Sequence, residues 1–154
     1  MGVAVQRVAA DDALVVPLNL GMAAELRARY GASADEEMIR FPATDFDPPD
    51  GGFVVLTIAG MTVAGGGFRR LDAETAELKR LWTHPEHRGR GLATRTIAEL
   101  EADTRGRGYR RLYLVSGPRQ PEAHRLYQSA GFRRLPDDPT VTGTLPAARF
   151  EKRL

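Results

Sequence analysis

The stretch from Thr83 to Ala93 constrains the fold of this chain more than any other part of the sequence. It reads Thr-His-Pro-Glu-His-Arg-Gly-Arg-Gly-Leu-Ala and separates a strand-like segment from a segment with helical periodicity. Gly89 and Gly91 permit backbone angles that other residues avoid, and they let the backbone come close to a ligand. The N–H groups and the positive dipole end of the following helix would face the same turn. The sequence therefore predicts an anion site, and phosphate is the anion that such sites commonly bind.

Two arginines strengthen this prediction, and the spacing of the glycines limits which phosphate-binding motif the turn can be. Arg88 and Arg90 would add charge-assisted hydrogen-bond donors for a phosphate. No Gly-Lys-Ser/Thr follows the glycines, so the turn is not a Walker loop. Thr94 stands where a dinucleotide fingerprint has its third glycine. From the turn alone, a surface turn without a ligand remains the alternative.

The composition indicates a globular protein and excludes several kinds of site. The 154 residues predict a single domain over 1–154, and 42% of them are hydrophobic and 27% charged. The absence of cysteine excludes disulfides, thiolate metal sites and a cysteine nucleophile. His84, His87 and His124 lack metal-ligand spacing with any carboxylate partner, so we expect no metal.

The charge and the apolar pattern predict that neither nucleic acid nor a membrane is the partner. The formal net charge is only +2, and no basic tail is present. No apolar run approaches the ~20 residues of a membrane span. Residues 1–7 do not place a basic segment ahead of an apolar one, so we expect no signal peptide and a cytoplasmic location.

Alternating strand and helix patterns predict an α+β fold with a mixed sheet. The predicted strands are 3–8, 53–59, 61–70, 77–83, 111–116, 132–135 and 147–154. The first predicted helix runs from a cap at Asp11 or Asp12 to about residue 30, with a break at Pro17. Two more run from 91 to about 105 and from Pro121 to about 130. Three consecutive glycines at 65–67 predict a bulge or a close backbone approach in their strand.

The segment 33–52 has an unusual charge distribution. It contains six acidic residues and one arginine, and prolines and glycines break it up. The acidic residues are Asp35, Glu36, Glu37, Asp45, Asp47 and Asp50. Two interpretations stay open: a solvated loop, or a negatively charged lip over an active site. The second would favour a small cationic primary amine as substrate, such as a polyamine, an amino sugar or a peptide N-terminus.

Two motifs about 35 residues apart resemble those of GNAT-type N-acetyltransferases. The pattern Arg88-x-x-Gly91-x-Ala93 resembles the coenzyme A pyrophosphate turn of that family. The segment from Gln120 to Phe132 resembles its Asn-x-x-Ala-x-x-Leu-Tyr-x-x-x-Gly-Phe element, with Gln120 in place of the usual asparagine. The resemblance implies a mostly antiparallel mixed sheet flanked by helices, in which a bulge opens a V-shaped cofactor cleft between the fourth and fifth strands.

The resemblance also implies a cosubstrate, acetyl-CoA, and the residues that would contact it. Those residues are Leu81, Trp82, Thr83, Arg88, Gly89, Arg90, Gly91, Leu92, Ala93 and Gln120. The acceptor would be the amine of a small molecule or a peptide, and a homodimer is compatible with this reading. A coenzyme A-binding sensor or scaffold without turnover is the alternative.

Two residues are candidates for the chemistry of acetyl transfer. Tyr127 of the Leu-Tyr element has a phenol of pKa near 10, close enough to a thiol near 8.5 to protonate the departing sulfur. Glu77 stands where the family can carry a base, but its pKa near 4.3 lies roughly six units below that of a lysine-like amine. Glu77 would therefore act through water, with a raised pKa, or on an α-amine. The structural alternatives are a core tyrosine for Tyr127 and an ion pair with Lys79 for Glu77.

Overall fold

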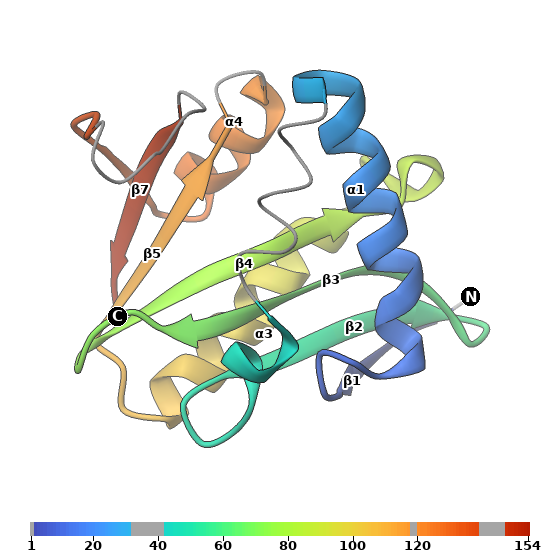
Figure 1. Cartoon of the computed structure of the whole chain (residues 1–154), viewed down its shortest axis with the longest axis horizontal. Helices are drawn as coiled ribbons and strands as arrows, with labels where there is room; N and C mark the ends of the chain where they lie inside the picture. The colour runs from blue at the N-terminus through green and yellow to red at the C-terminus, as the bar shows by residue number, and fades with distance from the viewer. Residues whose placement is uncertain (1, 32–41, 118–119, 139–146) are drawn as a thin grey trace.

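The computed structural model describes residues 2–31, 42–117, 120–138 and 147–154. Its strands form one open sheet in the order β1-β2-β3-β4-β5-β7-β6 (Figure 1). The strands are β1 (Val3–Arg7), β2 (Gly52–Ile58), β3 (Met61–Arg70), β4 (Thr75–Thr83), β5 (Arg111–Ser116), β6 (Arg133–Leu135) and β7 (Ala148–Arg153). Neighbours run antiparallel except β4 and β5, which are parallel. The predicted α+β fold with a mostly antiparallel mixed sheet is confirmed.

Within the described residues, three α-helices and three short 3-10 helices accompany the sheet. They are α1 (Val16–Tyr30), α3 (Leu92–Gly106), α4 (Pro121–Ser129), η1 (Ala13–Val15), η3 (Ala43–Phe46) and η4 (Pro85–His87). Figure 1 shows α1 in front of the sheet and α3 behind it. Part of the acidic segment, residues 33–41, lies outside the described residues.

The first α-helix begins later than the sequence suggests. Asp12 does cap a helix, because its side chain accepts a hydrogen bond from the Leu14 N–H at 2.8 Å, but that helix is η1. α1 starts at Val16, and Pro17 lies in its first turn, where the missing N–H has no intrahelical partner to lose. The predicted break therefore falls at the junction of η1 and α1. Gly31, with a φ of 72°, ends α1, in agreement with the predicted end at about residue 30.

Buried apolar side chains form clusters on both faces of the sheet. The cluster on the α1 face contains Ala10, Val15, Leu18, Phe46, Phe53, Val55 and Trp82. The larger cluster on the α3 face includes Leu78, Ile97, Leu100, Leu112, Leu114, Tyr127 and Phe150. Because strand residues alternate between faces, the residues next to Leu78, Leu112 and Phe150 along their strands point to the α1 side.

Trp82 packs beneath α1 through a glycine in that helix. A Cβ atom on Gly21 would lie 2.5 Å from Cζ2 of the indole, which is closer than such atoms approach one another. Trp82 is only 7% exposed, so its ring has little room to move aside. Gly21 therefore allows α1 to lie directly on the tryptophan.

Replacing Gly21 with alanine is expected to lower the free energy of unfolding by about 1–2 kcal/mol. Alanine favours a helix interior by about 1 kcal/mol over glycine, but the collision with the indole outweighs that gain. Urea unfolding measures the loss, and fluorescence of the single tryptophan should shift in the folded state. Gly106→Ala is the control, because its Cβ would meet nothing within 4 Å and should not destabilise the protein. Equal stabilities of the two variants would contradict the predicted collision.

One extra residue interrupts the pairing of β3 with β4. Gly65 lies opposite Trp82 and Gly67 opposite Lys79, so β4 advances three positions where β3 advances two. Arg80 supplies the extra position with a φ of 58°, which is the left-handed region. The extra residue of the bulge therefore lies in β4 and not in the glycine strand, which excludes one of the two alternatives left open by the sequence.

The glycines of β3 instead allow the close approach that was the other interpretation. A Cβ on Gly66 would lie 2.6 Å from the Leu81 side chain on one face. A Cβ on Gly67 would lie 2.5 Å from the Phe53 ring on the other face. Side chains at these positions would push neighbouring residues out of the bulged part of the sheet.

β4 and β5 separate soon after they begin to pair. Their parallel pairing runs only from Thr75–Arg111 to Glu77–Tyr113. Beyond this point β5 continues beside β7, and β4 continues beside β3 through the bulge. Along the second half of β4, β5 therefore no longer pairs with the backbone edge that faces it. The gap between the two strands is the predicted V-shaped cleft.

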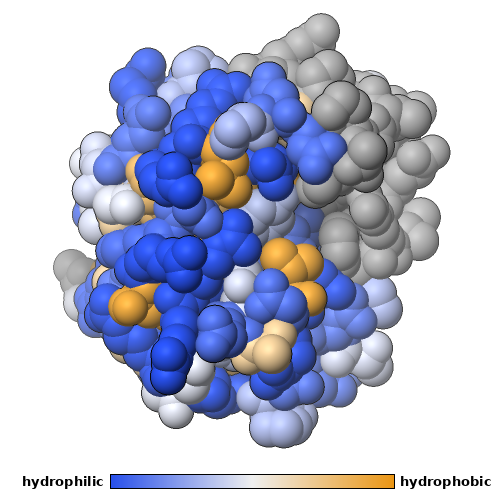
Figure 2. Space-filling view, turned by 90° about the vertical axis from the view of Figure 1, so that its left-hand side faces the viewer, coloured by the Kyte–Doolittle hydropathy of each residue, from blue (hydrophilic) through white to orange (hydrophobic). Residues whose placement is uncertain are grey.

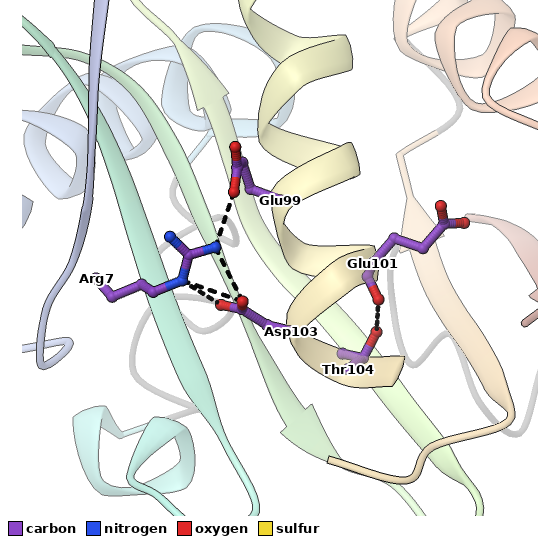
Figure 3. Close-up of polar contacts among 5 residues, drawn as sticks. All are labelled: Arg7, Glu99, Glu101, Asp103 and Thr104. Atoms are coloured by element: carbon purple, nitrogen blue, oxygen red, sulfur yellow. Dashed lines mark hydrogen bonds and ion pairs between the residues drawn. The ribbon is translucent and has the colours of Figure 1, made fainter. Parts of the chain in front are cut away.

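A cluster of charges joins β1 to α3 across the sheet (Figure 3). The Arg7 guanidinium contacts the Glu99 carboxylate at 2.8 Å and the Asp103 carboxylate at 2.9 Å. Hydrogen bonds to Asp103 and then Glu99 raise the pKa of Arg7. The two carboxylates lie one helical turn apart, so one planar guanidinium reaches both. Because the Arg7 side chain is 50% exposed, we assign this cluster no more than about 1 kcal/mol.

Charged side chains protect the opposite edge of the sheet, at β6, from pairing with another sheet. Figure 2 shows this side of the molecule as mostly hydrophilic, with apolar side chains in small separate groups. Its edge strand β6 has three residues, two of which are Arg133 and Arg134. A short, positively charged edge strand discourages pairing with another sheet.

Candidate active site

A cleft of about 520 Å³ lies beside the second half of β4. Its walls come from α1, β3, β4, the turn after β4, α3 and α4. The lining residues are Glu25, Arg29, Gly65, Leu81, Trp82, Thr83, His87, Arg88, Gly89, Gly91, Leu92, Ala93, Thr94, Thr96, Ile97, Gln120, Glu122, Ala123, Leu126 and Tyr127. Both motifs recognised in the sequence therefore meet in one cavity.

The glycine turn has the backbone geometry that an anion site requires. Gly89 and Gly91 have φ values of 77° and 75°, which favour glycine. Gly91 is the N-cap of α3, and no side chain caps this helix. The first helical hydrogen bond is donated by the Arg95 N–H to the Gly91 carbonyl at 3.0 Å. The N–H groups of residues 92–94 therefore have no partner within the helix, and they lie at the cleft wall.

The two arginines of the turn differ in position. Arg88 lines the cleft, donates to the Thr83 carbonyl at 3.3 Å and forms an ion pair with Glu25 of α1. Arg90 is exposed and does not line the cleft, and its guanidinium lies 3.4 Å from Nδ1 of His87. Of the two side chains, only that of Arg88 is placed to contact a ligand in the cavity.

Tyr127 lies on α4 with its side chain buried at the cleft wall. It is 7% exposed, and its ring centroid lies 5.4 Å from that of Phe150 and 6.2 Å from that of Phe132. Burial raises the pKa of Tyr127 to about 12, and the Ser116 hydroxyl partly opposes this shift. The phenol therefore keeps its proton throughout the neutral range and can donate a hydrogen bond inside the cleft.

The raised pKa of Tyr127 predicts how the free energy of unfolding changes at alkaline pH. An unfolded tyrosine loses its proton near pH 10, whereas folded Tyr127 keeps it until about pH 12. The stabilising contribution is complete below pH 10 and is lost as pH rises through about 12. Between these values wild type should lose about 2–3 kcal/mol more unfolding free energy than Tyr127→Phe. Parallel pH profiles from urea unfolding would argue against the shift.

Glu77 is buried in an ion pair outside the lining of the cleft. Its carboxylate accepts a hydrogen bond from Arg69 Nη1 at 2.9 Å, and Glu77 is 5% exposed. The sequence suggested Lys79 as the partner, but the observed partner, Arg69, comes from the neighbouring strand β3. Glu77 stands at the last paired position before β4 and β5 separate, on the α1 face of the sheet.

The described part of the acidic segment forms ion pairs with β3. Asp45 lies 3.4 Å from Arg69 and Asp50 lies 3.0 Å from Arg70. Neither carboxylate lines the cleft. Asp35, Glu36 and Glu37 lie outside the described residues. The predicted acidic lip is therefore not formed by Asp45 and Asp50, because neither carboxylate lines the cleft and each lies beside an arginine of β3.

The structure brings together most of the residues predicted for the site. Nine of the ten proposed cofactor contacts and Tyr127 line the cleft, and the two exceptions among all predicted residues are Arg90 and Glu77. Glu25 and Arg29 of α1 also line the cleft, and neither was predicted from the sequence as a site residue. No local motif marks them, because only the packing of α1 on the sheet brings them to the turn.

Two further features are absent from the described residues. No group of three or more histidines or acidic residues there is arranged to hold a metal ion. No helix among them is long and apolar enough to span a membrane.

Known sequences resemble this chain over most of its length. The family model of the acetyltransferase (GNAT) family matches residues 21–132. An uncharacterised N-acetyltransferase of Escherichia coli (strain K12), YjgM, is 28% identical over 120 residues, covering 72% of this chain and 72% of that protein.

Solved structures share the fold over the full chain. An acetyltransferase from Streptococcus agalactiae has a TM-score of 0.81 at 16% identity and covers 100% of this chain and 99% of its own. A GNAT family acetyltransferase from Elizabethkingia anophelis, with acetyl-CoA bound, has a TM-score of 0.71 at 13% identity. The match covers 99% of this chain and 98% of that protein. At these identities the likeness extends to the fold alone.

Proposed function

This chain belongs to the acetyltransferase (GNAT) family, and we propose that it transfers an acetyl group from acetyl-CoA directly to a primary amine. One observation carries the proposal: the glycine turn, the start of α3 and the buried Tyr127 line the same cleft. The turn suits a diphosphate, and the phenol suits a departing thiolate. A single cavity therefore offers groups for both ends of the cosubstrate.

The chemistry of the cleft fits coenzyme A. Backbone N–H groups of residues 92–94 and the Arg88 side chain can bind the diphosphate. The free edge of β4 at Leu81, Trp82 and Thr83 can pair with the amide groups of pantetheine. The related fold from Elizabethkingia anophelis, which has acetyl-CoA bound, supports this choice.

Tyr127 and Glu77 each have a defined role in the proposed acetyl transfer. Acetyl-CoA supplies an acetyl group activated as a thioester. Tyr127 holds a proton on its phenol oxygen and gives it to the sulfur as the carbon–sulfur bond breaks. The attacking amine must lose a proton, and Glu77 would take it through water, since its carboxylate is buried beside Arg69. Tyr127 then regains its proton from solvent.

The acceptor is proposed only as a class, the primary amine of a small molecule or a peptide. The paired charges of Asp45 and Asp50 do not favour a cationic acceptor over a neutral one. An acceptor screen is therefore the informative experiment on specificity. Amines of different charge should be compared at equal acetyl-CoA concentration.

Trp82 provides the binding test, because it is the single tryptophan and lines the cleft. We expect its fluorescence to change on titration with acetyl-CoA, and a panel of amines to release free thiol in a second assay. Binding without release for any acceptor would favour the alternative, a silent coenzyme A sensor. Absence of acetyl-CoA binding in calorimetry would overturn the proposal.

A further inference from the structure

A carboxylate of α1 engages the arginine that faces the proposed diphosphate site. Glu25 and Arg88 form an ion pair, and both side chains line the cleft. They are separated by 63 positions in sequence. The Glu25 side chain is 30% exposed and that of Arg88 is 46% exposed, so solvent and ligands can reach both.

We propose that Glu25 competes with the cofactor diphosphate for Arg88, and so sets the affinity of the cleft for coenzyme A. The inference rests on the proposed function. A diphosphate at the turn would present oxygens to the guanidinium that Glu25 contacts. Its negative charge would also lie near the Glu25 carboxylate and be repelled by it. Binding then exchanges one anion for another on Arg88.

The displaced carboxylate has a cation within reach. Arg29 lies four residues after Glu25 on α1 and lines the same cleft. A glutamate four residues before an arginine is the favourable order for a helical ion pair. Glu25 can therefore turn along its own helix toward Arg29 when a diphosphate takes Arg88.

A different role would give the opposite result. A guanidinium has five N–H donors, so Glu25 could hold Arg88 in place while other donors contact the diphosphate. In that arrangement Glu25 would be a positioning residue, and its removal would weaken binding. The sign of the change in Kd on Glu25→Gln separates competition from positioning.

The test measures the Kd of coenzyme A by Trp82 fluorescence and by calorimetry. At low salt, Glu25→Gln should lower the Kd by about 3–10-fold, and the effect should shrink as salt screens the charges. Glu86→Gln is the matched control, because it removes the same charge from an exposed position two residues before Arg88. It should change the Kd by less than about twofold. Pantetheine, which has no diphosphate, should bind wild type and Glu25→Gln equally.

A double-mutant cycle with Arg88→Gln assigns the effect to the pair. If Glu25 acts through Arg88, Glu25→Gln should tighten binding much less in the Arg88→Gln background. An unchanged or higher Kd for Glu25→Gln at low salt would overturn the inference while leaving the proposed function intact. Failure of wild type to bind coenzyme A would instead remove the proposed function itself.

Discussion

Replacing Tyr127 with phenylalanine is expected to lower kcat for acetyl transfer by about 10²–10⁴-fold, the usual contribution of a general acid. The substitution removes the phenol proton and keeps the ring, whose contacts with Phe132 and Phe150 should hold α4 in place. The Kd of coenzyme A should change little. Thiol release under saturating substrates, with Kd from Trp82 fluorescence, measures both quantities.

Tyr109→Phe provides the matched control for this experiment. Tyr109 is also buried, but its hydroxyl donates to the Asp50 carbonyl at 2.6 Å and it does not line the cleft. Its loss should cost about 1 kcal/mol of stability and leave kcat unchanged. If Tyr127→Phe keeps its kcat while chemistry limits the rate, Tyr127 serves packing only.

Gly91→Val is expected to raise the Kd of acetyl-CoA by about 10–100-fold, as charge-assisted hydrogen bonds to the diphosphate are lost. Gly91 has a φ of 75°, a conformation that a β-branched residue strongly disfavours. The turn should relax to another conformation, and the N–H groups at the start of α3 would then no longer converge. Calorimetric titration of acetyl-CoA measures the change.

Gly60→Val separates backbone strain from lost ligand contacts. Gly60 has a φ of 80° in the β2–β3 turn, and a Cβ there, as at Gly91, would meet nothing within 4 Å. Both variants should lose a similar amount of stability, about 1–2 kcal/mol. Only the change at Gly91 should weaken binding. Equal Kd values for the two variants would mean that the turn does not hold the cosubstrate.

Local features of the sequence were enough to predict most elements of this fold. The junction between the predicted strands 53–59 and 61–70 is a hairpin turn at Ala59 and Gly60, with φ values of 51° and 80°, and Gly91 starts α3 in the left-handed region. Pro121 lies in the first turn of α4, as predicted. These predictions hold because turns and helix ends depend on a few adjacent residues. The turn motif and Leu-Tyr element likewise predicted residues that line a common cleft.

Features that depend on two segments meeting could not be predicted in this way. Three glycines in β3 suggested either a bulge or a close approach there, and the extra residue is instead Arg80 of β4, because register is a property of the strand pair. Glu77 pairs with Arg69 of the next strand, and the sequence offered only Lys79 beside it.

The residues of the cleft also fall into two groups: those that the sequence predicts and those that only the tertiary structure brings there. The sequence by itself determined the conformation of the glycine turn, since that conformation needs only Gly89, Gly91 and the helix that follows. Only the tertiary structure decided that Glu25 of α1 meets Arg88 at that turn. α1 reaches the turn because Gly21 lets it pack on Trp82, and that packing joins residues that no local pattern connects.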